Sequence, residues 1–287
     1  MKVLLAVDGS DQSFDAVRAM GCLSPAEPLV VLHVIHLPQL SYPTLGPNLN
    51  KDLALTVEQA MKEEGERLLD RSVSLLPPHH GMTVRKLVEG TPSETILQEA
   101  ELCGADIIVM GDRGLGQIKE QFLGSVSHRI MTHATCSVFI VKKPIRHTKK
   151  ILVPIGGPED AQAIGDFFAK KPFRESPEIT VLHVVPFSEP AWPVGAMIPE
   201  SFRKEMLAHG KEMANDVVKT IEKSGYAANS LAVVGAPSVA IVQEAVNNEA
   251  DLILMRSHSR SGVSRFFLGS VSHGVMHHAG CSVLIIR

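Results

Sequence analysis

A long segment from the middle of the chain recurs at its end. The twenty residues FLGSVSHRIMTHATCSVFIV, 122–141, and FLGSVSHGVMHHAGCSVLII, 267–286, are identical at fourteen positions with a constant offset of 145. The match extends upstream, where VEGTPSETILQEA, 88–100, aligns with VVGAPSVAIVQEA, 233–245, at the same offset. Because only two copies are present and each has the size of a domain, the repeat predicts a tandem duplication and not a solenoid.

The repeat divides the 287 residues into two predicted domains, 1–146 and 147–287. A short basic segment, KKPIRHTKK at 142–150, lies at this boundary. The length fits two domains on the usual relation between chain length and domain number. Hydrophobic residues make up 45% of the chain, which is enough to build a core in each half.

Short apolar runs alternate with helical patterns in each half. In the first half the runs of strand length cover 3–7, 29–35, 83–88, 106–110 and 138–141. Helical spacing covers 13–22, 53–76, 92–102 and 126–133. Continuous apolar runs are typical of strands that are covered on both faces. The alternation therefore predicts an α/β fold with two Rossmann-like domains, each a five-stranded parallel doubly wound sheet flanked by helices.

The last apolar run of each half, VFIV at 138–141 and VLII at 283–286, forms an edge of its predicted sheet. An unpaired apolar edge invites pairing with another strand. We therefore predict that the two halves pair through these edges inside one chain and form a pseudo-dimer. Whether two chains associate further into a homodimer is left open.

The segment GDRGLGQIKEQFLGSVSH, 111–128, follows the fourth predicted strand, which ends at Met110. Ligands of doubly wound sheets bind beyond the carboxyl ends of the strands. Gly111 and Gly114 are expected in the loop, and Gly124 with Ser125 opens the next helix. Glycine lets the backbone approach an anion closely, and the N–H groups at a helix start point toward it. The segment thus predicts a phosphate site, although it is neither a P-loop nor a G-x-G-x-x-G motif.

These residues resemble the universal stress protein family, whose ATP-binding members carry the pattern G-x2-G-x9-G-[ST]. Gly111, Gly114, Gly124 and Ser125 match this pattern at every fixed position. The opening AVDGS, the LHVI of the second strand and the segment GTPSETIL also resemble the family, and the resemblance covers both halves. It implies HUP-type domains and a stress-response protein that acts through bound ATP, with magnesium as the accompanying ion.

The resemblance also implies a binding site in the first half. The backbone near Val7 and the side chain of Val34 would border the adenine, Asp8 would lie near the ribose or a magnesium ion, and the glycine segment would hold the phosphates. Lys119 is a nearby cation without an assigned role. From the residues alone, Asp8 in DGSD is either a turn residue ahead of a capped helix or a ligand, and its place at the carboxyl end of the first strand favours the ligand role. The residues expected to bind the nucleotide are Val7, Asp8, Val34, Met110, Gly111, Arg113, Gly114, Gly124, Ser125, Val126 and Ser127.

The second half departs from this pattern. The replacements are Gly156 for Asp8, Arg256 for Gly111 and Ser259 for Gly114, whereas Gly269 and Ser270 are kept. Side chains at the lost glycines would crowd the phosphate path and no carboxylate would remain to meet the ribose, so we expect weak or absent ATP binding there. There are two alternatives for the second half. In one, it serves mainly as the structural partner of the first half. In the other, it binds a smaller anion through a basic site formed by Arg256, His258, Arg260 and Arg265.

Histidines offer a further candidate site. His273 and His277 lie one helical turn apart with His278 adjacent, a spacing that could begin a metal site. The equivalent segment of the first half offers only His128 and His133. The number of ligands in either half alone therefore argues against zinc.

Two classes of function remain open for the predicted site. In the first, ATP occupancy orders the glycine segment and changes a surface that partner proteins read. In the second, the chain hydrolyses ATP, which needs a positioned water and charge stabilisation at the γ-phosphate. Beyond Asp8, Arg113 and Ser125 the sequence offers no such set and no dedicated base, so we assign no catalytic residue and favour binding with slow or no turnover. A scaffold that acts only through protein contacts is a third alternative.

Charge and composition exclude several partners. The formal net charge of −3 and the pI near 6.5 give no basic excess, so neither nucleic acid nor an anionic membrane is expected. The apolar run before Asp8 is too short for a secretory core, and no run reaches the roughly eighteen residues of a membrane span. The four cysteines form no C-x-x-C pair. We therefore expect a soluble cytoplasmic protein with reduced thiols.

Overall fold

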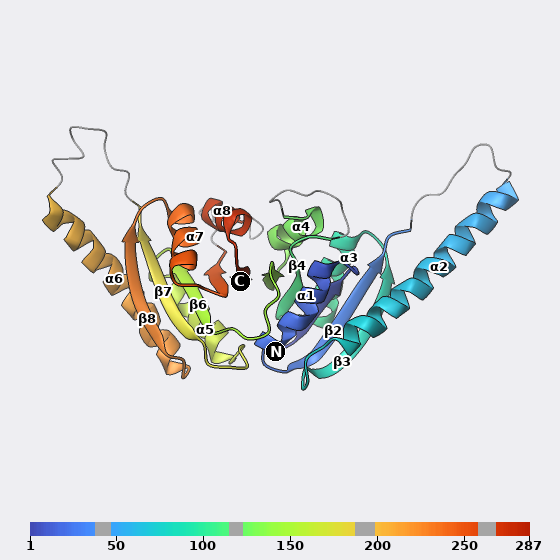
Figure 1. Ribbon diagram of the computed structural model, residues 1–287, viewed down its shortest axis with the longest axis horizontal. Coiled ribbons are helices and arrows are strands. Elements are labelled where there is room, and N and C mark those ends of the chain that lie inside the picture. Colours follow the sequence, from blue (N-terminus) through green and yellow to red (C-terminus); the bar gives the residue numbers. More distant parts are fainter. Residues whose placement is uncertain (38–46, 115–122, 187–198, 258–267) are drawn as a thin grey trace.

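Figure 1 shows the computed structural model of the chain as two α/β halves that lie side by side. It describes residues 1–37, 47–114, 123–186, 199–257 and 268–287. The first half contains β1 (Val3–Val7), α1 (Asp11–Ala19), a 3-10 turn η1 (Met20–Cys22), β2 (Ala26–Ile35), α2 (Pro47–Ser74), β3 (Gly81–Glu89), α3 (Pro92–Cys103), β4 (Ile107–Gly111), α4 (Ser125–His133) and β5 (Ser137–Val141). The second half contains β6 (Lys150–Ile155), α5 (Asp160–Ala169), β7 (Glu178–Val185), α6 (Glu200–Lys223), β8 (Ala228–Val234), α7 (Pro237–Asn247), β9 (Leu252–Arg256), α8 (Ser270–His278) and β10 (Ser282–Ile286).

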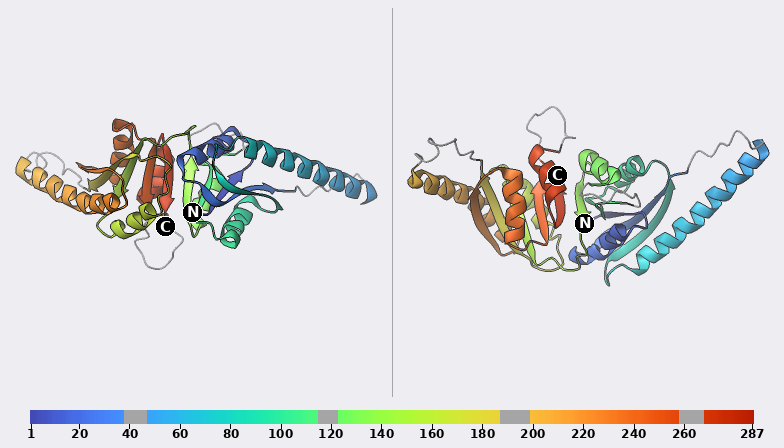
Figure 2. Two further views of the ribbon diagram at one scale, coloured as in Figure 1. Left: turned by 90° about the horizontal axis from the view of Figure 1, so that it is seen from below. Right: turned by 45° about the horizontal axis from the view of Figure 1, so that its top comes forward.

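All ten strands belong to one sheet, in the order β3-β2-β1-β4-β5-β10-β9-β6-β7-β8. Within each half every pair is parallel, and the two halves have the same strand order. The predicted fold of two five-stranded parallel sheets with flanking helices is therefore confirmed. The predicted edge pairing is also confirmed, because β5 and β10 pair antiparallel with Leu284 opposite Phe139. Figure 2 shows that the halves meet edge to edge in further views.

Helices cover both faces of the sheet, which explains the uniformly apolar strands. Val3, Leu5 and Val7 of β1 contribute to one buried cluster, and Leu4 and Ala6 contribute to the other. Helices α1, α2, α5 and α6 pack on the first face, whereas α3, α4, α7 and α8 pack on the second. Both clusters continue through β5 and β10, so the core on each face of the sheet runs across the seam between the halves.

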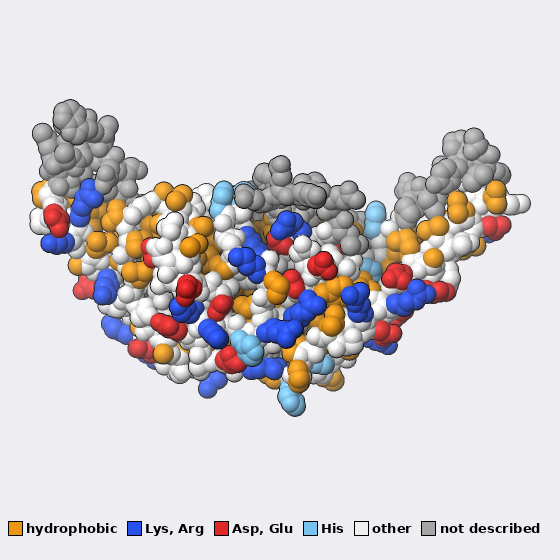
Figure 3. All heavy atoms as spheres, in the orientation of Figure 1, with side chains coloured by type: hydrophobic (Ala, Val, Ile, Leu, Met, Phe, Trp, Pro, Cys, Tyr) orange, Lys and Arg blue, Asp and Glu red, His pale blue; other side chains and the backbone are white. Residues whose placement is uncertain are grey.

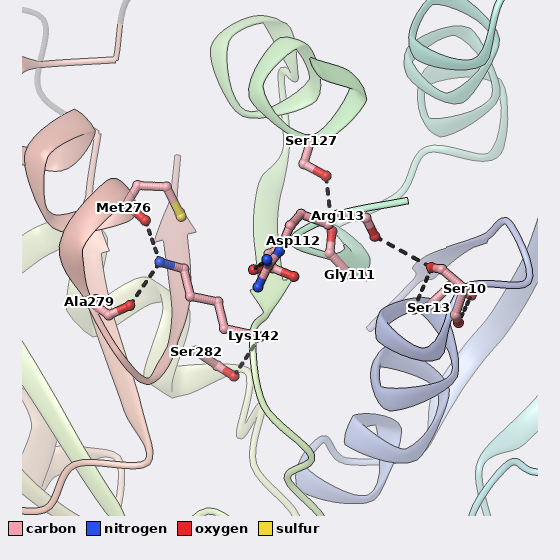
Figure 4. A network of polar contacts seen from close by, with 10 residues as sticks. All are labelled: Ser10, Ser13, Gly111, Asp112, Arg113, Ser127, Lys142, Met276, Ala279 and Ser282. Atoms are coloured by element: carbon pink, nitrogen blue, oxygen red, sulfur yellow. Dashed lines mark hydrogen bonds and ion pairs between the residues drawn. The ribbon is translucent and has the colours of Figure 1, made fainter. Parts of the chain in front are cut away.

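Two basic residues at equivalent positions bind the halves together. Lys142 follows β5, and its Nζ donates to the carbonyl oxygens of Met276 and, at 2.9 Å, of Ala279 at the end of α8 (Figure 4). Arg287 follows β10, and its Nη2 donates to the carbonyl oxygen of Met131 in α4. Positive charge at the carboxyl end of a helix interacts favourably with the helix dipole. Each half therefore caps a helix of the other.

The structure corrects two details of the first half. The fourth strand continues through Gly111, which pairs with Val141, so Met110 does not end it as expected. The second strand begins at Ala26 and the second helix at Pro47, earlier than the apolar patterns indicate. No described helix has the length and apolar character needed to cross a membrane. Acidic and basic side chains are intermingled over the face in Figure 3.

Candidate functional site

A cavity of about 390 Å³ opens at the carboxyl ends of β1 and β4. Every residue that the sequence predicts for the nucleotide site lines it, namely Val7, Asp8, Val34, Met110, Gly111, Arg113, Gly114, Gly124, Ser125, Val126 and Ser127. The lining also includes Ala6, Ser13, Leu32, Pro92, Ile96 and Leu123, which the sequence reasoning missed. The structure thus brings the candidate residues together from four separate segments of the chain. Lys119 lies outside the described residues.

Asp8 directly follows β1, and its two carboxylate oxygens make different contacts. Oδ1 accepts hydrogen bonds from the backbone N–H of Ser10 at 3.0 Å and from its hydroxyl at 2.6 Å. Ser10 is the N-cap of α1, and its Oγ accepts from the N–H of Ser13 at 3.2 Å. Oδ2 faces Gly114, where an added Cβ would lie 2.3 Å from it. Asp8 is therefore a turn residue through one oxygen and a member of the cavity wall through the other.

The three glycines of the motif permit close backbone approaches. A Cβ at Gly111 would lie 2.8 Å from the backbone carbonyl of Gln12, at the start of α1. A Cβ at Gly124 would lie 3.3 Å from the Asp112 carbonyl oxygen, to which the Gly124 N–H donates at 2.8 Å. These distances leave little or no room for a side chain at either position. The glycines therefore bring β4, α1 and the start of α4 close together around the cavity.

The start of α4 presents backbone N–H groups to the cavity. Gly124 is the N-cap and makes no side-chain capping hydrogen bond. The first N–H groups of a helix have no partner within it, and the helix dipole adds positive potential there. The hydroxyl of buried Ser127 donates to the carbonyl oxygen of Gly111 at 3.0 Å. Its hydroxyl hydrogen is thus used inside the fold, and Ser127 would meet an anion through its backbone N–H.

The opposite wall is apolar. Leu32 and Val34 share one face of β2 because they are two residues apart in a strand. Pro92 and Ile96 lie one turn apart at the start of α3. These two spacings are the signals by which Leu32, Pro92 and Ile96 could have been found from the sequence. Together these side chains make this part of the cavity lining apolar.

Asp112 and Arg113 lie side by side where the chain leaves β4 (Figure 4). Nε of Arg113 is 3.3 Å from Oδ2 of Asp112, and Asp112 is only 7% exposed. Burial raises the pKa of the Asp112 carboxyl, and the positive charges of Arg113 and Lys142 only partly oppose this effect. The sequence analysis did not single out Asp112, because the burial of this side chain depends on the fold.

The equivalent end of the second half holds an internal ion pair. Asp160 of α5 is 1% exposed, and its Oδ2 accepts from the N–H of Gly156 at 2.8 Å. Nη1 of Arg256 lies 3.5 Å from the other carboxylate oxygen and donates to the carbonyl oxygen of Glu159 at 3.0 Å. A carboxylate therefore lies close to Gly156, the position equivalent to Asp8, but it is bonded within the protein, and the expectation that none is left to meet a ribose stays a prediction. Ser259, His258, Arg260 and Arg265 lie outside the described residues.

The structure also corrects the argument against zinc, which rested on the number of histidines in each half alone. His128 of α4 lies beside His273 and His277 of α8, so ligands from the two halves must be counted together. In the described part of the chain, the cluster does not include His133 or His278. The pairing of β5 with β10 creates this proximity.

Comparison with known proteins gives consistent matches over the whole chain. The model of the universal stress protein family matches residues 1–142 and 147–287. A universal stress protein of Mycolicibacterium smegmatis is 25% identical over 305 aligned residues, which cover 99% of this chain and 96% of that protein. The crystal structure of a universal stress protein from Archaeoglobus fulgidus superposes with a TM-score of 0.64 at 22% identity, covering 100% of this chain and 96% of that one. Another matched structure is a universal stress protein in complex with cAMP, at 18% identity and a TM-score of 0.31 over 49% of this chain and 97% of that one.

Proposed function

This chain belongs to the universal stress protein family, and on that premise we propose that it is a stress-response protein whose first half binds ATP. The observation that carries the proposal is the convergence of Asp8, the three glycines and the start of α4 on one cavity. One wall of that cavity is apolar and suits a base, whereas the other offers N–H groups that suit phosphates. ATP contains both kinds of group.

The phosphate side rests on backbone groups and on Arg113. Free N–H groups at a helix start and the aligned helix dipole favour bound anions. The guanidinium of Arg113 is shared with Asp112 and is 39% exposed, so it can also face a phosphate. Magnesium prefers oxygen ligands and is commonly held by one or two carboxylates together with substrate phosphates. Oδ2 of Asp8 is the carboxylate oxygen that faces the glycine segment.

The same wall gives little support for efficient hydrolysis. The charged side chains among the described lining residues are Asp8 and Arg113. Oδ1 of Asp8 is already bonded twice to Ser10, which leaves only Oδ2 of this carboxylate to meet a water molecule. We therefore favour a binding protein in which bound ATP contacts the segments around α1, β4 and α4 and so alters a surface that partner proteins recognise. A slow ATP hydrolase and a scaffold without nucleotide are the alternatives.

Calorimetric titration of the nucleotide-free full chain with ATP and magnesium tests the proposal. The informative variant is Gly124→Ser. Serine is a favourable N-cap, so the helix should persist once the Asp112 carbonyl, 3.3 Å from the added Cβ, shifts by a few tenths of an ångström. The serine hydroxyl would then accept from the N–H groups of Val126 or Ser127 and compete with phosphate. Thermal unfolding of the variant checks that the added Cβ has not disrupted the fold. Gly269→Ser is the matched control, because Gly269 is the N-cap of α8 in the second half.

We expect one ATP per chain, weaker binding in Gly124→Ser and unchanged binding in Gly269→Ser. Two ATP molecules per chain, or equal losses in both variants, would contradict the assignment to the first half. Tighter binding of cAMP than of ATP would reassign the ligand. A folded chain that binds neither nucleotide would favour the scaffold, and release of phosphate during the titration would favour the hydrolase.

A further inference from the structure

Three histidine side chains from the two halves gather at the seam. One ring nitrogen of each of His128, His273 and His277 lies within 4.8 Å of those of the other two. The ring centroids of His273 and His277 are 4.4 Å apart, and those of His128 lie 5.9 Å from His273 and 6.4 Å from His277. His128 and His273 are exposed and His277 is half-buried, so an ion from solution can reach them.

The internal symmetry of the chain explains two of the three histidines. His128 and His273 occupy equivalent positions of the repeat, 145 residues apart. The antiparallel pairing of β5 with β10 relates the halves by an approximate two-fold axis, and equivalent residues near such an axis meet. Symmetry alone therefore supplies a pair.

The third histidine breaks the symmetry. His277 is equivalent to Thr132, which is not a metal ligand of this type. His277 follows His273 by four residues in α8, so the two rings project from one face of the helix. Two histidines at this spacing on a helix are the arrangement that binds zinc in H-E-x-x-H motifs. The second half thus contributes a bidentate pair, and the first half adds the ligand opposite.

The surrounding contacts hold the two helices in place. Lys142 donates to carbonyl oxygens at the end of α8, and Arg287 donates to a carbonyl oxygen of α4. Met131 and Met276, on the buried sides of these helices, are fully covered by the core. The backbones that carry the histidines are therefore fixed, and only side-chain rotation is needed to bring the ring nitrogens to one centre.

We propose that His128, His273 and His277 bind a divalent transition-metal ion, zinc above all, across the seam between the two halves. Imidazole nitrogen suits zinc, copper and nickel, and three histidines with one open position are a known zinc arrangement. In such a centre the zinc–nitrogen bonds are about 2.0–2.1 Å long, so the nitrogens move closer together than they are now. The ion pins α4 to α8, and the open position holds water or a small anion.

Zinc titration of the chelator-treated full chain tests the proposal, with calorimetry for affinity and the visible spectrum of bound cobalt for geometry. The variants are His277→Thr, which restores the residue of the equivalent position, and His128→Gln. His278→Gln is the control, because His278 is adjacent in sequence, exposed, and bonded through Nδ1 to the Gly274 carbonyl oxygen. Far-ultraviolet circular dichroism of each metal-free variant checks folding.

We expect one zinc ion per chain and a tetrahedral cobalt spectrum. Loss of a residue that only supports a metal ligand typically weakens metal binding by about 10- to 100-fold. His277→Thr and His128→Gln each remove a ligand itself, so each should weaken zinc binding by more than this. His278→Gln should bind as the unaltered chain does. Failure of the folded chain to bind zinc, or affinity that both variants leave unchanged, would overturn the proposal. Loss in His277→Thr but not in His128→Gln would also overturn it, because the site would then lie within α8 alone.

Discussion

Replacing Gly114 with alanine should weaken nucleotide binding while leaving the first half folded. The added Cβ would lie 2.3 Å from Oδ2 of Asp8, far inside contact distance, so the carboxylate must rotate away. Its two hydrogen bonds from Ser10 would then change, and its face toward the cavity would be lost. Because a hydrogen bond to a charged group contributes about 1.5–3 kcal/mol, we expect the affinity for ATP with magnesium to fall by about 10- to 150-fold.

Gly111→Ala is the matched comparison, since it also adds one methyl group to the same wall. Here the Cβ would meet the backbone carbonyl of Gln12 at 2.8 Å, and a backbone carbonyl cannot rotate away as a side chain can. Overpacking costs about 1–3 kcal/mol, so the thermal midpoint should fall by about 2–12 °C. Calorimetric titration and thermal unfolding of both variants separate the effects. The reasoning fails if Gly114→Ala binds ATP normally, or if it destabilises the chain as much as Gly111→Ala does.

Two further predictions concern the seam. Lys142→Met keeps the aliphatic stem but removes the charged donor to Met276 and Ala279, so the free energy of unfolding should fall by about 1.5–3 kcal/mol. The control is Lys143→Met, which should change this free energy little because Lys143 is exposed. Equal effects of the two variants in denaturant titrations would contradict the capping role of Lys142. Asp112→Asn should raise the thermal midpoint at pH 7, because burial raises the pKa of this carboxyl and its charged form therefore opposes folding. The gain should shrink as the pH falls toward the ordinary value of 3.8, and a gain independent of pH would show that charge is not the cause.

The sequence predicted the fold well because the features that determine it are local or repeated. Continuous apolar runs indicated strands covered on both faces, and the duplicated edge runs indicated where the halves meet. The location of the cavity also followed, because parallel strands place their carboxyl ends together and the glycines follow one of those ends. Gly111 was expected in the loop because the apolar run ends at Met110, but its backbone pairs with Val141 all the same.

The features that the sequence did not reveal depend on contacts between distant segments. Asp112 becomes buried only when the chain folds, so its raised pKa has no local signature. Asp160 lies in α5, four residues after Gly156, where the alignment with Asp8 gave no reason to look. The histidine cluster was missed because each half was counted alone. An approximate two-fold axis at the seam makes equivalent residues neighbours, and this could have been argued once the edge pairing was predicted.

The two halves have diverged in complementary ways. At the carboxyl ends of the strands, the first half keeps an open cavity, whereas the second half places Arg256 against Asp160 there. At the seam the halves remain alike, since Lys142 and Arg287 make reciprocal contacts with the helix of the other half. One difference there is His277, which stands where the first half has Thr132. A chain that bound one nucleotide and one metal ion would need this asymmetry, because two copies of the first half would offer two cavities and only a pair of histidines on the axis. His128 directly follows Ser127, so a metal ion at the seam would hold the same helix whose first turn faces the cavity.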